Sequence, residues 1–255
     1  MREELGRGPQ TAVGDELVTV LFAHALIVAF AYAPIGTYRL SSVEDMRIGI
    51  LGTGTLARAL ADVWAQSGHD VMLGGRSPEK AAALAASLGA RVSGGDLLQA
   101  AKGRDAVLLA VPWDAVADVL ATVGASLAGQ VLIDPVNPVR YSDGTMLVGD
   151  GHSAAQEIAR LAPGAHVVKA FTFFPASQWH PGEGHVTVAM CGDKDQTMDV
   201  VGTLVRDAGG VPANLGPLSR ARQLEEAAGL VFALVAGGFD PRSAVPSVPQ
   251  VSRGA

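Results

Sequence analysis

The chain has 255 residues, of which 49% are hydrophobic, 17% charged and 5% aromatic, and its formal net charge is −6. This composition excludes a disordered chain, which combines low hydrophobicity with high net charge, and it is typical of a compact α/β fold. The acidic balance argues against nucleic acid as a partner, and a single cysteine excludes both a disulfide framework and a cysteine-based zinc site, so we expect a cytoplasmic protein without a metal.

The first 45 residues differ from the rest, because residues 17–35 are almost wholly apolar. A signal peptide needs a basic start, whereas acidic residues precede this run. A membrane anchor needs about 20 apolar residues, which the run barely reaches. A packed extra helix and a stretch translated upstream of a start at Met46 are the alternatives. We favour the last, and we expect residues 1–45 to be dispensable for cofactor binding, since they hold no strand or phosphate-loop signal.

From Met46 onward, short apolar runs alternate with helical patterns. Strands are expected at 47–51, 70–74, 90–93, 105–111, 130–134, 166–171, 185–191 and 211–215. Helices are expected at 59–67, 78–88, 95–102, 113–123, 153–161, 194–208 and 219–236. Such alternation predicts a doubly wound, mostly parallel sheet covered on both faces. The sequence therefore indicates a Rossmann-like α/β domain over 46–236 with a small C-terminal α/β extension, followed by an irregular tail at 237–255.

A glycine-rich loop follows the first expected strand. It reads Gly52-Thr53-Gly54-Thr55-Leu56-Ala57, a G-x-G-x-x-A pattern. The first glycine permits a tight turn, the second lets the backbone approach a pyrophosphate, and the small sixth residue lets the helix pack close to the sheet. The amides and the dipole at the start of the helix then favour phosphates. The loop predicts a dinucleotide site, against the alternative of a glycine-rich turn without a ligand.

The end of the second expected strand indicates which dinucleotide binds. A site for NAD usually has a carboxylate there, to bind the ribose 2′-hydroxyl. This chain instead continues Gly74-Gly75-Arg76-Ser77-Pro78-Glu79-Lys80. Arg76 and Lys80 can meet a 2′-phosphate and Ser77 can donate to it, while Glu79 is expected in the first helical turn. The sequence therefore favours NADP, unless Arg76 and Lys80 are ordinary solvated charges.

With these segments in view, the chain resembles the NADP-dependent reductases of the deazaflavin coenzyme F-420, over residues 46 to about 236. The matching segments are RIGILGTGTLA, LGGRSPEK, AVPWDAV, DPVNPV, SAAQEIA, VAMCGD and GPLSRARQLE. The resemblance implies an oxidoreductase with a small Rossmann-like domain, often a homodimer. It also implies direct hydride transfer between NADPH and the deazaflavin as its small-molecule co-substrate.

The resemblance also implies roles for single residues. Thr53, Gly54, Thr55 and Leu56 would hold the NADP phosphates and the adjacent ribose, and Arg76 and Lys80 the 2′-phosphate. The residues beside the nicotinamide would be Val111, Pro112, Trp113, Asn137, Val139 and Ala176. The chain departs from the family at Gly75, where a serine is frequent, in the aromatic segment AFTFFPA, and after Gly237. The last departure affects residues that, by the resemblance, would form part of the deazaflavin pocket.

No catalytic acid, base or nucleophile stands out, and hydride transfer between two ring cofactors requires none. Lys169 is interpreted as structural, His69 as a turn residue and Cys191 as a small buried hydrophobe. For Trp113 and Trp179 two roles are open: each could flank the flat ring of a bound cofactor or belong to the hydrophobic core.

Three alternatives remain for the function. The first is an NADP-dependent reductase of a small carbonyl or imine, against which the short chain after the sheet argues. The second is a redox sensor that binds NADPH without turnover. The third is a membrane-tethered domain that feeds electrons to a membrane partner, which depends on the apolar N-terminal segment.

Overall fold

The computed structural model describes residues 45–181 and 186–244. Residues 45–255 form one compact unit, separate from residues 1–44. The predictions made for residues 1–44 and for the end of the tail, 245–255, therefore lie outside the described residues. Within the described ranges, no helix combines the length and the apolar character needed to cross a membrane.

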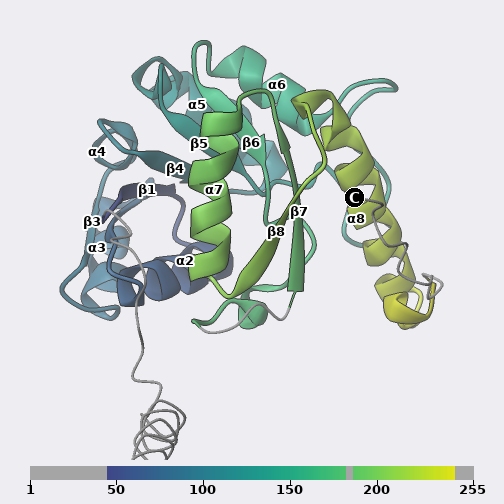
Figure 1. The fold of residues 1–255 in the computed structure, drawn as a ribbon, viewed down its shortest axis with the longest axis horizontal. Coiled ribbons are helices and arrows are strands. Elements are labelled where there is room, and N and C mark those ends of the chain that lie inside the picture. Colours follow the sequence, from purple (N-terminus) through teal and green to yellow (C-terminus); the bar gives the residue numbers. More distant parts are fainter. Residues whose placement is uncertain (1–44, 182–185, 245–255) are drawn as a thin grey trace, which may run out of the picture. The chain divides into compact units, whose positions relative to one another are not determined.

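A single eight-stranded sheet forms the centre of the molecule (Figure 1). Its strands are β1 Arg47–Leu51, β2 Asp70–Gly74, β3 Val92–Gly95, β4 Ala106–Leu109, β5 Val131–Asp134, β6 His166–Lys169, β7 Val186–Gly192 and β8 Gly210–Asn214. The spatial order is β3-β2-β1-β4-β5-β6-β7-β8, and every neighbouring pair is parallel except β6 with β7. The first six strands follow the Rossmann order, in which the strand order reverses between β1 and β4 although the two strands are parallel. The mostly parallel Rossmann-like sheet is thus confirmed, and β7 and β8 form its C-terminal extension.

Helices cover both faces of this sheet, as the continuous apolar strands predict. One face is packed by α2 Thr55–Gln66, α3 Pro78–Ala86 and α7 Asp195–Asp207. The other is packed by α4 Leu97–Ala101, α5 Trp113–Val123, α6 Ala154–Leu161 and α8 Ala221–Ala236. Short 3-10 turns lie at Gly124–Leu127, Ala176–Gln178, Leu218–Arg220 and Pro241–Ala244. The last one falls in the part of the tail that the sequence predicted to be irregular.

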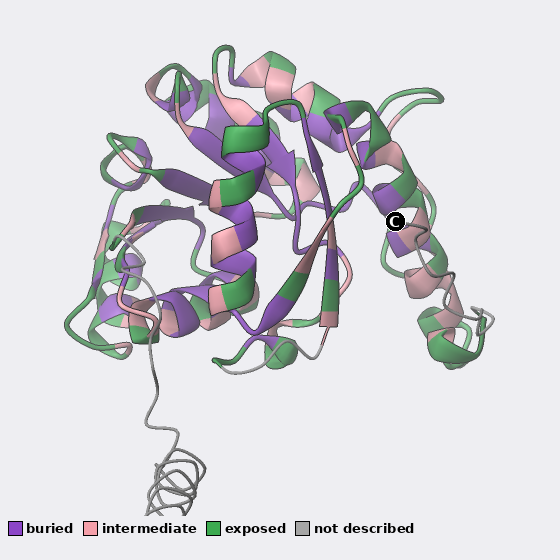
Figure 2. Cartoon of the chain, viewed as in Figure 1, coloured by how far each residue is buried: buried purple, intermediate pink, exposed green. Residues whose placement is uncertain are grey.

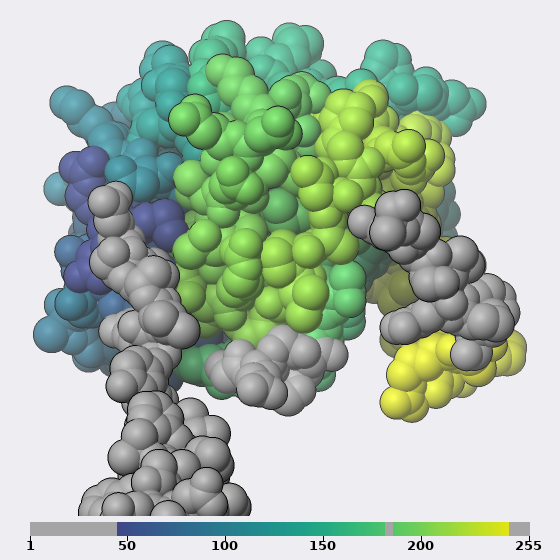
Figure 3. All heavy atoms as spheres, viewed as in Figure 1, coloured from purple at the N-terminus to yellow at the C-terminus, as the bar shows by residue number. Residues whose placement is uncertain are grey.

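Burial follows the helical and strand periodicities (Figure 2). In α2, Leu60, Val63 and Trp64 are buried, at the i, i+3, i+4 spacing of one helix face. All residues of β4 and β5 are buried, because a helix layer lies on each side of them. In the space-filling view, α7 forms the middle of the visible face, with α8 beside it (Figure 3).

Element types are as predicted, but several ends differ. The third strand begins two residues later than expected, because Val71 pairs with Val92. The strand expected at 105–111 ends at Leu109, and the next residues leave the sheet. The strand expected at 166–171 ends at Lys169, since Phe171 adopts φ +61°, a left-handed conformation that ends the extended chain. In both places the chain bends away at the carboxyl edge of the sheet.

Candidate functional site

A cleft of about 200 Å³ lies at the carboxyl ends of the first, second and fourth strands. Its lining residues are Gly52, Thr53, Gly54, Gly75, Arg76, Leu97, Ala110, Val111, Pro112, Ala115 and Val119. In an open α/β sheet, ligands bind at this edge where the strand order reverses, here between β1 and β4. The glycine loop, the end of β2 and the end of β4 are therefore brought to one place.

The two loop glycines have different reasons to be glycine. Gly52 has φ +128°, and a Cβ there would lie 2.1 Å from the carbonyl oxygen of Ala110. The fold itself therefore requires glycine at that position. Gly54 has an ordinary extended conformation, and a Cβ there would meet no atom within 4 Å. The chain's own packing does not explain Gly54, whereas a ligand backbone that must come close to the loop does.

The first turn of α2 offers free amides to this cleft. The N-cap residue Gly54 has no side chain to cap the helix, and no acidic residue lies in the first turn. By contrast, Ser77, Asp96 and Ser153 cap α3, α4 and α6 with side-chain oxygens. Unpaired amides and the positive end of the helix dipole together favour an anion. The local structure thus fits the pyrophosphate of a dinucleotide.

Arg76 lines the same cleft at the end of β2. Its side chain is exposed and makes no hydrogen bond or ion pair with any part of the chain that the structure describes. The hydroxyl of Ser77 donates to Glu79 (2.8 Å) and accepts from the amide of Lys80 (3.3 Å), so it serves as the cap of α3. Glu79 lies in the first turn of α3, as expected. Arg76 therefore offers the unengaged guanidinium that a 2′-phosphate requires, while the Ser77 proton is engaged.

The remaining predicted site residues do not line the cleft. Thr55 and Leu56 form the first turn of α2, and Lys80 is exposed on α3. Asn137 and Val139 are buried in the segment after β5. Ala176 is half-buried in a 3-10 turn that lies against α2.

Trp113 begins α5 and faces a second cavity of about 570 Å³. The other lining residues are Val148, Gly149, His152, Ser153, Gln156, Glu157 and Arg160. Pro112, the preceding residue, lines the glycine-loop cleft, so two consecutive residues border the two cavities.

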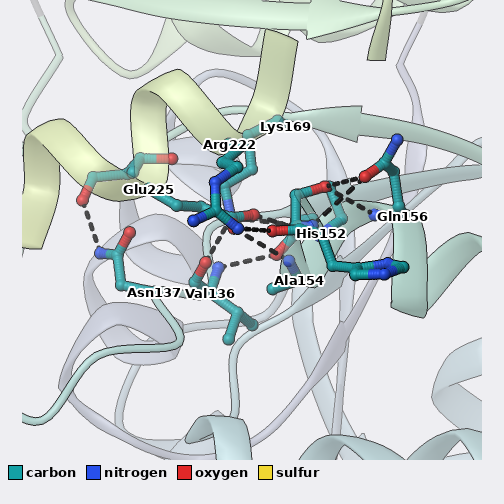
Figure 4. Close-up of polar contacts among 12 residues, drawn as sticks. Val136, Asn137, His152, Ala154, Gln156, Lys169, Arg222 and Glu225 are labelled. Atoms are coloured by element: carbon teal, nitrogen blue, oxygen red, sulfur yellow. Dashed lines mark hydrogen bonds and ion pairs between the residues drawn. The ribbon is translucent and has the colours of Figure 1, made fainter. Parts of the chain in front are cut away.

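A buried ionic cluster lies beneath the ends of β5 and β6 (Figure 4). The ammonium of Lys169 is 3.2 Å from a carboxylate oxygen of Asp134 and 3.0 Å from one of Glu225, and it also donates to the carbonyl of Val136. All three charged side chains are fully buried. Glu225 accepts further hydrogen bonds from the first two amides of α6, those of Ala154 (2.9 Å) and Ala155 (3.1 Å). The cluster thereby ties β5, β6, α6 and α8 together.

Burial raises the pKa of Asp134 above its ordinary value, while the nearby Lys169 acts in the opposite direction. Asp134 also accepts from the amide of Val136 (2.8 Å), so it holds the start of the loop that carries Asn137. The cluster does not line either cavity described above. Its place beneath that loop suits a role in holding the site rather than in touching a ligand.

Sequence reasoning missed Asp134 and Glu225. One available signal was a carboxylate directly after the apolar run of β5. The other was a glutamate among Ala221, Leu224 and Ala228 on the buried face of α8. Lys169 was interpreted as structural, and its complete burial with two carboxylates agrees with that interpretation.

His69, Trp179 and Cys191 were also interpreted from the sequence, and none of them lines the glycine-loop cleft. His69 lies in the turn between α2 and β2, where its ring accepts from the amide of Met46 (3.1 Å) and meets Asp207 (3.0 Å). Trp179 is a core residue that packs against Phe171 with ring centroids 5.0 Å apart. Cys191 is buried, and burial raises the pKa of its thiol to about 11. Among the residues that the structure describes, no group of acidic, histidine or cysteine side chains could hold a metal ion.

Comparison with known proteins identifies two groups of relatives. The chain is 31% identical over 211 residues to the F420-dependent NADP reductase of Methanothermobacter marburgensis. The aligned region covers 74% of this chain and 92% of that protein. The chain is also 33% identical over 184 residues to the metalloreductase STEAP3 of Rattus norvegicus, which covers 71% of this chain. The chain spans only 36% of the length of that metalloreductase.

A solved structure and a family description agree with the first group. The structure of a candidate F420-dependent NADP-reductase from Arthrobacter sp. FB24 is similar, with a TM-score of 0.66 and 27% identity over 76% of this chain and 96% of that one. The family described as NADP oxidoreductase, coenzyme F420-dependent, matches residues 47–138, from β1 to the loop after β5. Since the Methanothermobacter reductase is matched over nearly its whole length, the chain belongs to the coenzyme F420-dependent NADP oxidoreductase family and is an NADP-dependent oxidoreductase.

Proposed function

We propose that this protein transfers a hydride between NADP(H) and the deazaflavin coenzyme F420. The observation that carries the proposal is the similarity to an F420-dependent NADP reductase over 92% of that relative's length. The glycine-loop cleft supports the NADP part of the proposal, because Arg76 is in its lining and no carboxylate there would repel a 2′-phosphate. A hydride passed directly between two rings needs orientation and exclusion of water, not a proton relay.

In this proposal the cleft holds NADP(H) through groups that have no other task in the fold. Thr53, Gly54, Thr55 and Leu56 supply the loop and the free amides of α2 for the phosphates. Arg76 binds the 2′-phosphate in paired, charge-assisted hydrogen bonds, and Lys80 adds a second positive charge from α3. Gly52 lines the cleft and shapes the turn of the loop.

The nicotinamide end then lies on the other side of β1, toward β4, β5 and β6. When bound, NADPH supplies a hydride, which the deazaflavin accepts together with one proton from water. Val111 lines the cleft beside β4, and Asn137, Val139 and Ala176 follow farther along this edge. Pro112 lines the cleft and Trp113 borders the second cavity, which has the size of a small-molecule site, so we assign that cavity to the deazaflavin.

The acceptor is tested with the purified full chain and NADPH. Deazaflavin, flavin, a ferric chelate and a panel of carbonyls and imines are added in turn, and NADPH absorbance is followed. We expect oxidation with the deazaflavin and little with the other acceptors. The ferric chelate belongs in the panel because STEAP3 is a metalloreductase. Turnover of that chelate, of a carbonyl or of an imine without turnover of the deazaflavin contradicts the proposal. Tight NADPH binding without any turnover would point to a redox sensor.

The predicted homodimer and cytoplasmic location also belong to this proposal. Exposed apolar side chains gather toward the end of α8, where Leu230 is 56%, Val235 57% and Phe239 67% exposed. Tyr141 packs edge-on against Phe232 of the same helix, with ring centroids 4.9 Å apart. A second copy that covers these residues would remove apolar surface from water. Sedimentation analysis of the full chain measures the assembly, and a monomer at micromolar concentration would contradict a stable dimer.

A further inference from the structure

The connection between β5 and α6 is held by one face of α8. It spans residues 135–153 and contains no helix, only an isolated bridge between Val139 and Met146. Connections of more than about 12–15 residues without regular structure are uncommon in compact domains and usually serve a function. The residues of α8 that contact this connection or the start of α6 recur every three or four positions, so they share one helix face; they are Arg222, Glu225, Gly229 and Phe232.

Arg222 fixes the last turn of the connection (Figure 4). Its Nη1 donates to the backbone carbonyls of Gly149 (2.7 Å) and His152 (2.6 Å), and its Nε donates to Glu226 (2.7 Å). The amide of His152 also donates to the carbonyl of Gly149 (3.2 Å), so residues 149–152 form a closed turn. Hydrogen bonds from a guanidinium are stronger than neutral ones, and only 22% of the Arg222 side chain is exposed. One side chain of α8 therefore determines where this turn lies.

Farther along the same face, α8 and the connection touch through their backbones. A Cβ on Gly229 would lie 2.9 Å from the carbonyl oxygen of Gly144, so only glycine permits this approach. Glycine destabilises the interior of a helix relative to alanine, which means that the close contact has a structural use. One helical turn later, Phe232 packs edge-on against Tyr141 with ring centroids 4.9 Å apart. The connection is thus fitted to α8 along most of its length, and Arg222 is the polar end of that contact.

The turn that Arg222 holds is part of the wall of the second cavity. Val148, Gly149 and His152 line this cavity from the connection, and Trp113 lines it from α5. Arg222 binds two of these lining residues but does not line the cavity itself. Arg222 therefore acts on the shape of the cavity without touching its contents.

The other polar side chains of the lining are largely paired with one another. Ser153 and Gln156 form the capping box of α6, and Arg160 donates to Glu157 (2.9 Å). Side chains that are already engaged leave the fit of a ligand to depend on where the walls stand. The position of the turn at 149–152 is accordingly a main determinant of what the cavity can hold.

We propose that Arg222 positions the wall of the second cavity for the hydride acceptor. It holds the turn in the bound arrangement before the acceptor arrives, so the acceptor does not lose binding free energy in ordering it. The inference rests on the proposed assignment of this cavity to the hydride acceptor. It leaves the NADP cleft untouched, because the turn and Arg222 are not in the lining of that cleft.

The variant Arg222→Met tests the inference, because it removes both hydrogen bonds to the turn and keeps an apolar stem. Steady-state kinetics give KM and kcat for the acceptor that the wild type reduces, and a titration gives Kd for NADPH. KM for the acceptor should rise about tenfold, as expected for the loss of a charge-assisted hydrogen bond. Less than about a twofold change is expected in kcat, and none in Kd for NADPH. Arg222→Lys should recover part of the lost affinity, since an ammonium can still donate to the carbonyls.

Two variants on the same stretch of chain are matched controls. Arg220, two positions earlier, is exposed and donates to Gln223 (3.4 Å), not to the connection, so Arg220→Met should leave KM unchanged. Glu226→Gln removes the ion pair of Arg222 but leaves its bonds to the turn, so KM should change much less than in Arg222→Met.

Hydrogen exchange measures the turn itself and needs no acceptor. In Arg222→Met the amides of residues 139–152 should exchange faster than in the wild type, because the turn has lost its attachment to α8. The amides of residues 47–66, which form β1, the glycine loop and α2, should exchange at the same rate in both proteins.

Three outcomes overturn the inference. In one, Arg222→Met leaves KM for the acceptor unchanged. In the second, it weakens NADPH binding as much as acceptor binding, which assigns Arg222 to the stability of the whole domain. In the third, exchange of residues 139–152 does not change. Kinetics use whichever acceptor is reduced and the exchange measurement uses none, so failure of deazaflavin turnover tests the proposed function separately.

Discussion

The glycine-loop cleft and the Lys169 cluster lie at the same edge of one sheet but handle polar groups in opposite ways. In the cleft, the amides of α2 are uncapped and Arg76 has no partner among the described residues. In the cluster, Lys169 meets two carboxylates and a carbonyl, and Glu225 meets two amides as well. Unpaired groups that water can reach cost little and leave room for a ligand, whereas buried charges are stable only when paired. The comparison separates residues kept for binding from residues kept for the fold.

The largest expected effect is in the cluster. Lys169→Met leaves Asp134 and Glu225 buried without their cation, which should destabilise the protein by about 3–5 kcal/mol. The free energy of unfolding is measured by chemical denaturation. Arg47→Ala is the control, because Arg47 forms an exposed pair with Asp105 (3.3 Å), worth at most about 1 kcal/mol. If both variants lowered the free energy of unfolding equally, Lys169 would not be stabilising two buried carboxylates.

The two loop glycines, Gly52 and Gly54, separate a residue that the fold needs from one that the ligand needs. Gly52→Ala places a Cβ against the carbonyl of Ala110 at a positive φ, so we expect a loss of about 2 kcal/mol or more in stability. Gly54→Ala meets no atom and should leave stability unchanged or slightly higher. It should nevertheless weaken NADPH binding at least tenfold, about 1.4 kcal/mol, because the methyl group occupies the path of the pyrophosphate. Thermal melts measure the stability of both variants, and NADPH titrations measure their affinity. A lower melting temperature for Gly54→Ala would mean that the fold needs this glycine.

Arg76→Ala should affect one coenzyme and not the other. A charge-assisted hydrogen bond contributes about 1.5–3 kcal/mol, so NADPH binding should weaken about 10- to 150-fold. NADH binding should hardly change, because it has no group for Arg76 to hold. Arg91→Ala, which removes an exposed pair with Asp70 at the other end of β2, is the control. Equal losses for both coenzymes would assign Arg76 to the fold or to the adenine, and a wild type that prefers NADH would refute the assignment.

The smallest effect concerns Cys191, which lies opposite Lys169 in the pairing of β6 with β7. Burial raises the pKa of its thiol from 9.0 to about 11. Between those values the unfolded chain releases the thiol proton and the folded chain keeps it, so this contribution to stability is lost as pH rises through 9 toward 11. At pH 10 the loss is about 1.4 kcal/mol. The free energy of unfolding of wild type and Cys191→Ala is measured by chemical denaturation from pH 8 to 10. If it changed equally with pH in both proteins, the thiol of Cys191 would not cause the loss.

The parts of the fold and site that the sequence predicted correctly are those coded within a few neighbouring residues. The apolar runs of β1, β2 and β5 and the periodicity of α2 and α5 each lie in one segment, so their type could be recognised directly. The G-x-G-x-x-A loop and Arg76 lie within 25 positions of each other, and the structure brings both to one cleft. Strand ends were less accurate, because the bends after β4 and β6 depend on packing at the sheet edge, as the positive φ of Phe171 shows.

The sequence by itself determined the element types, the phosphate-binding loop and the absence of a carboxylate at the end of β2. Each depends on local backbone preferences and short spacings. Only the tertiary structure decided that Asp134 and Lys169, 35 positions apart, share one buried cluster, and that Glu225 reaches the amide of Ala154, 71 positions away. It also decided that Arg222 reaches the carbonyl of Gly149, 73 positions away. Whether a charge is paired or a polar atom satisfied depends on burial and on distant neighbours, and no local pattern specifies these.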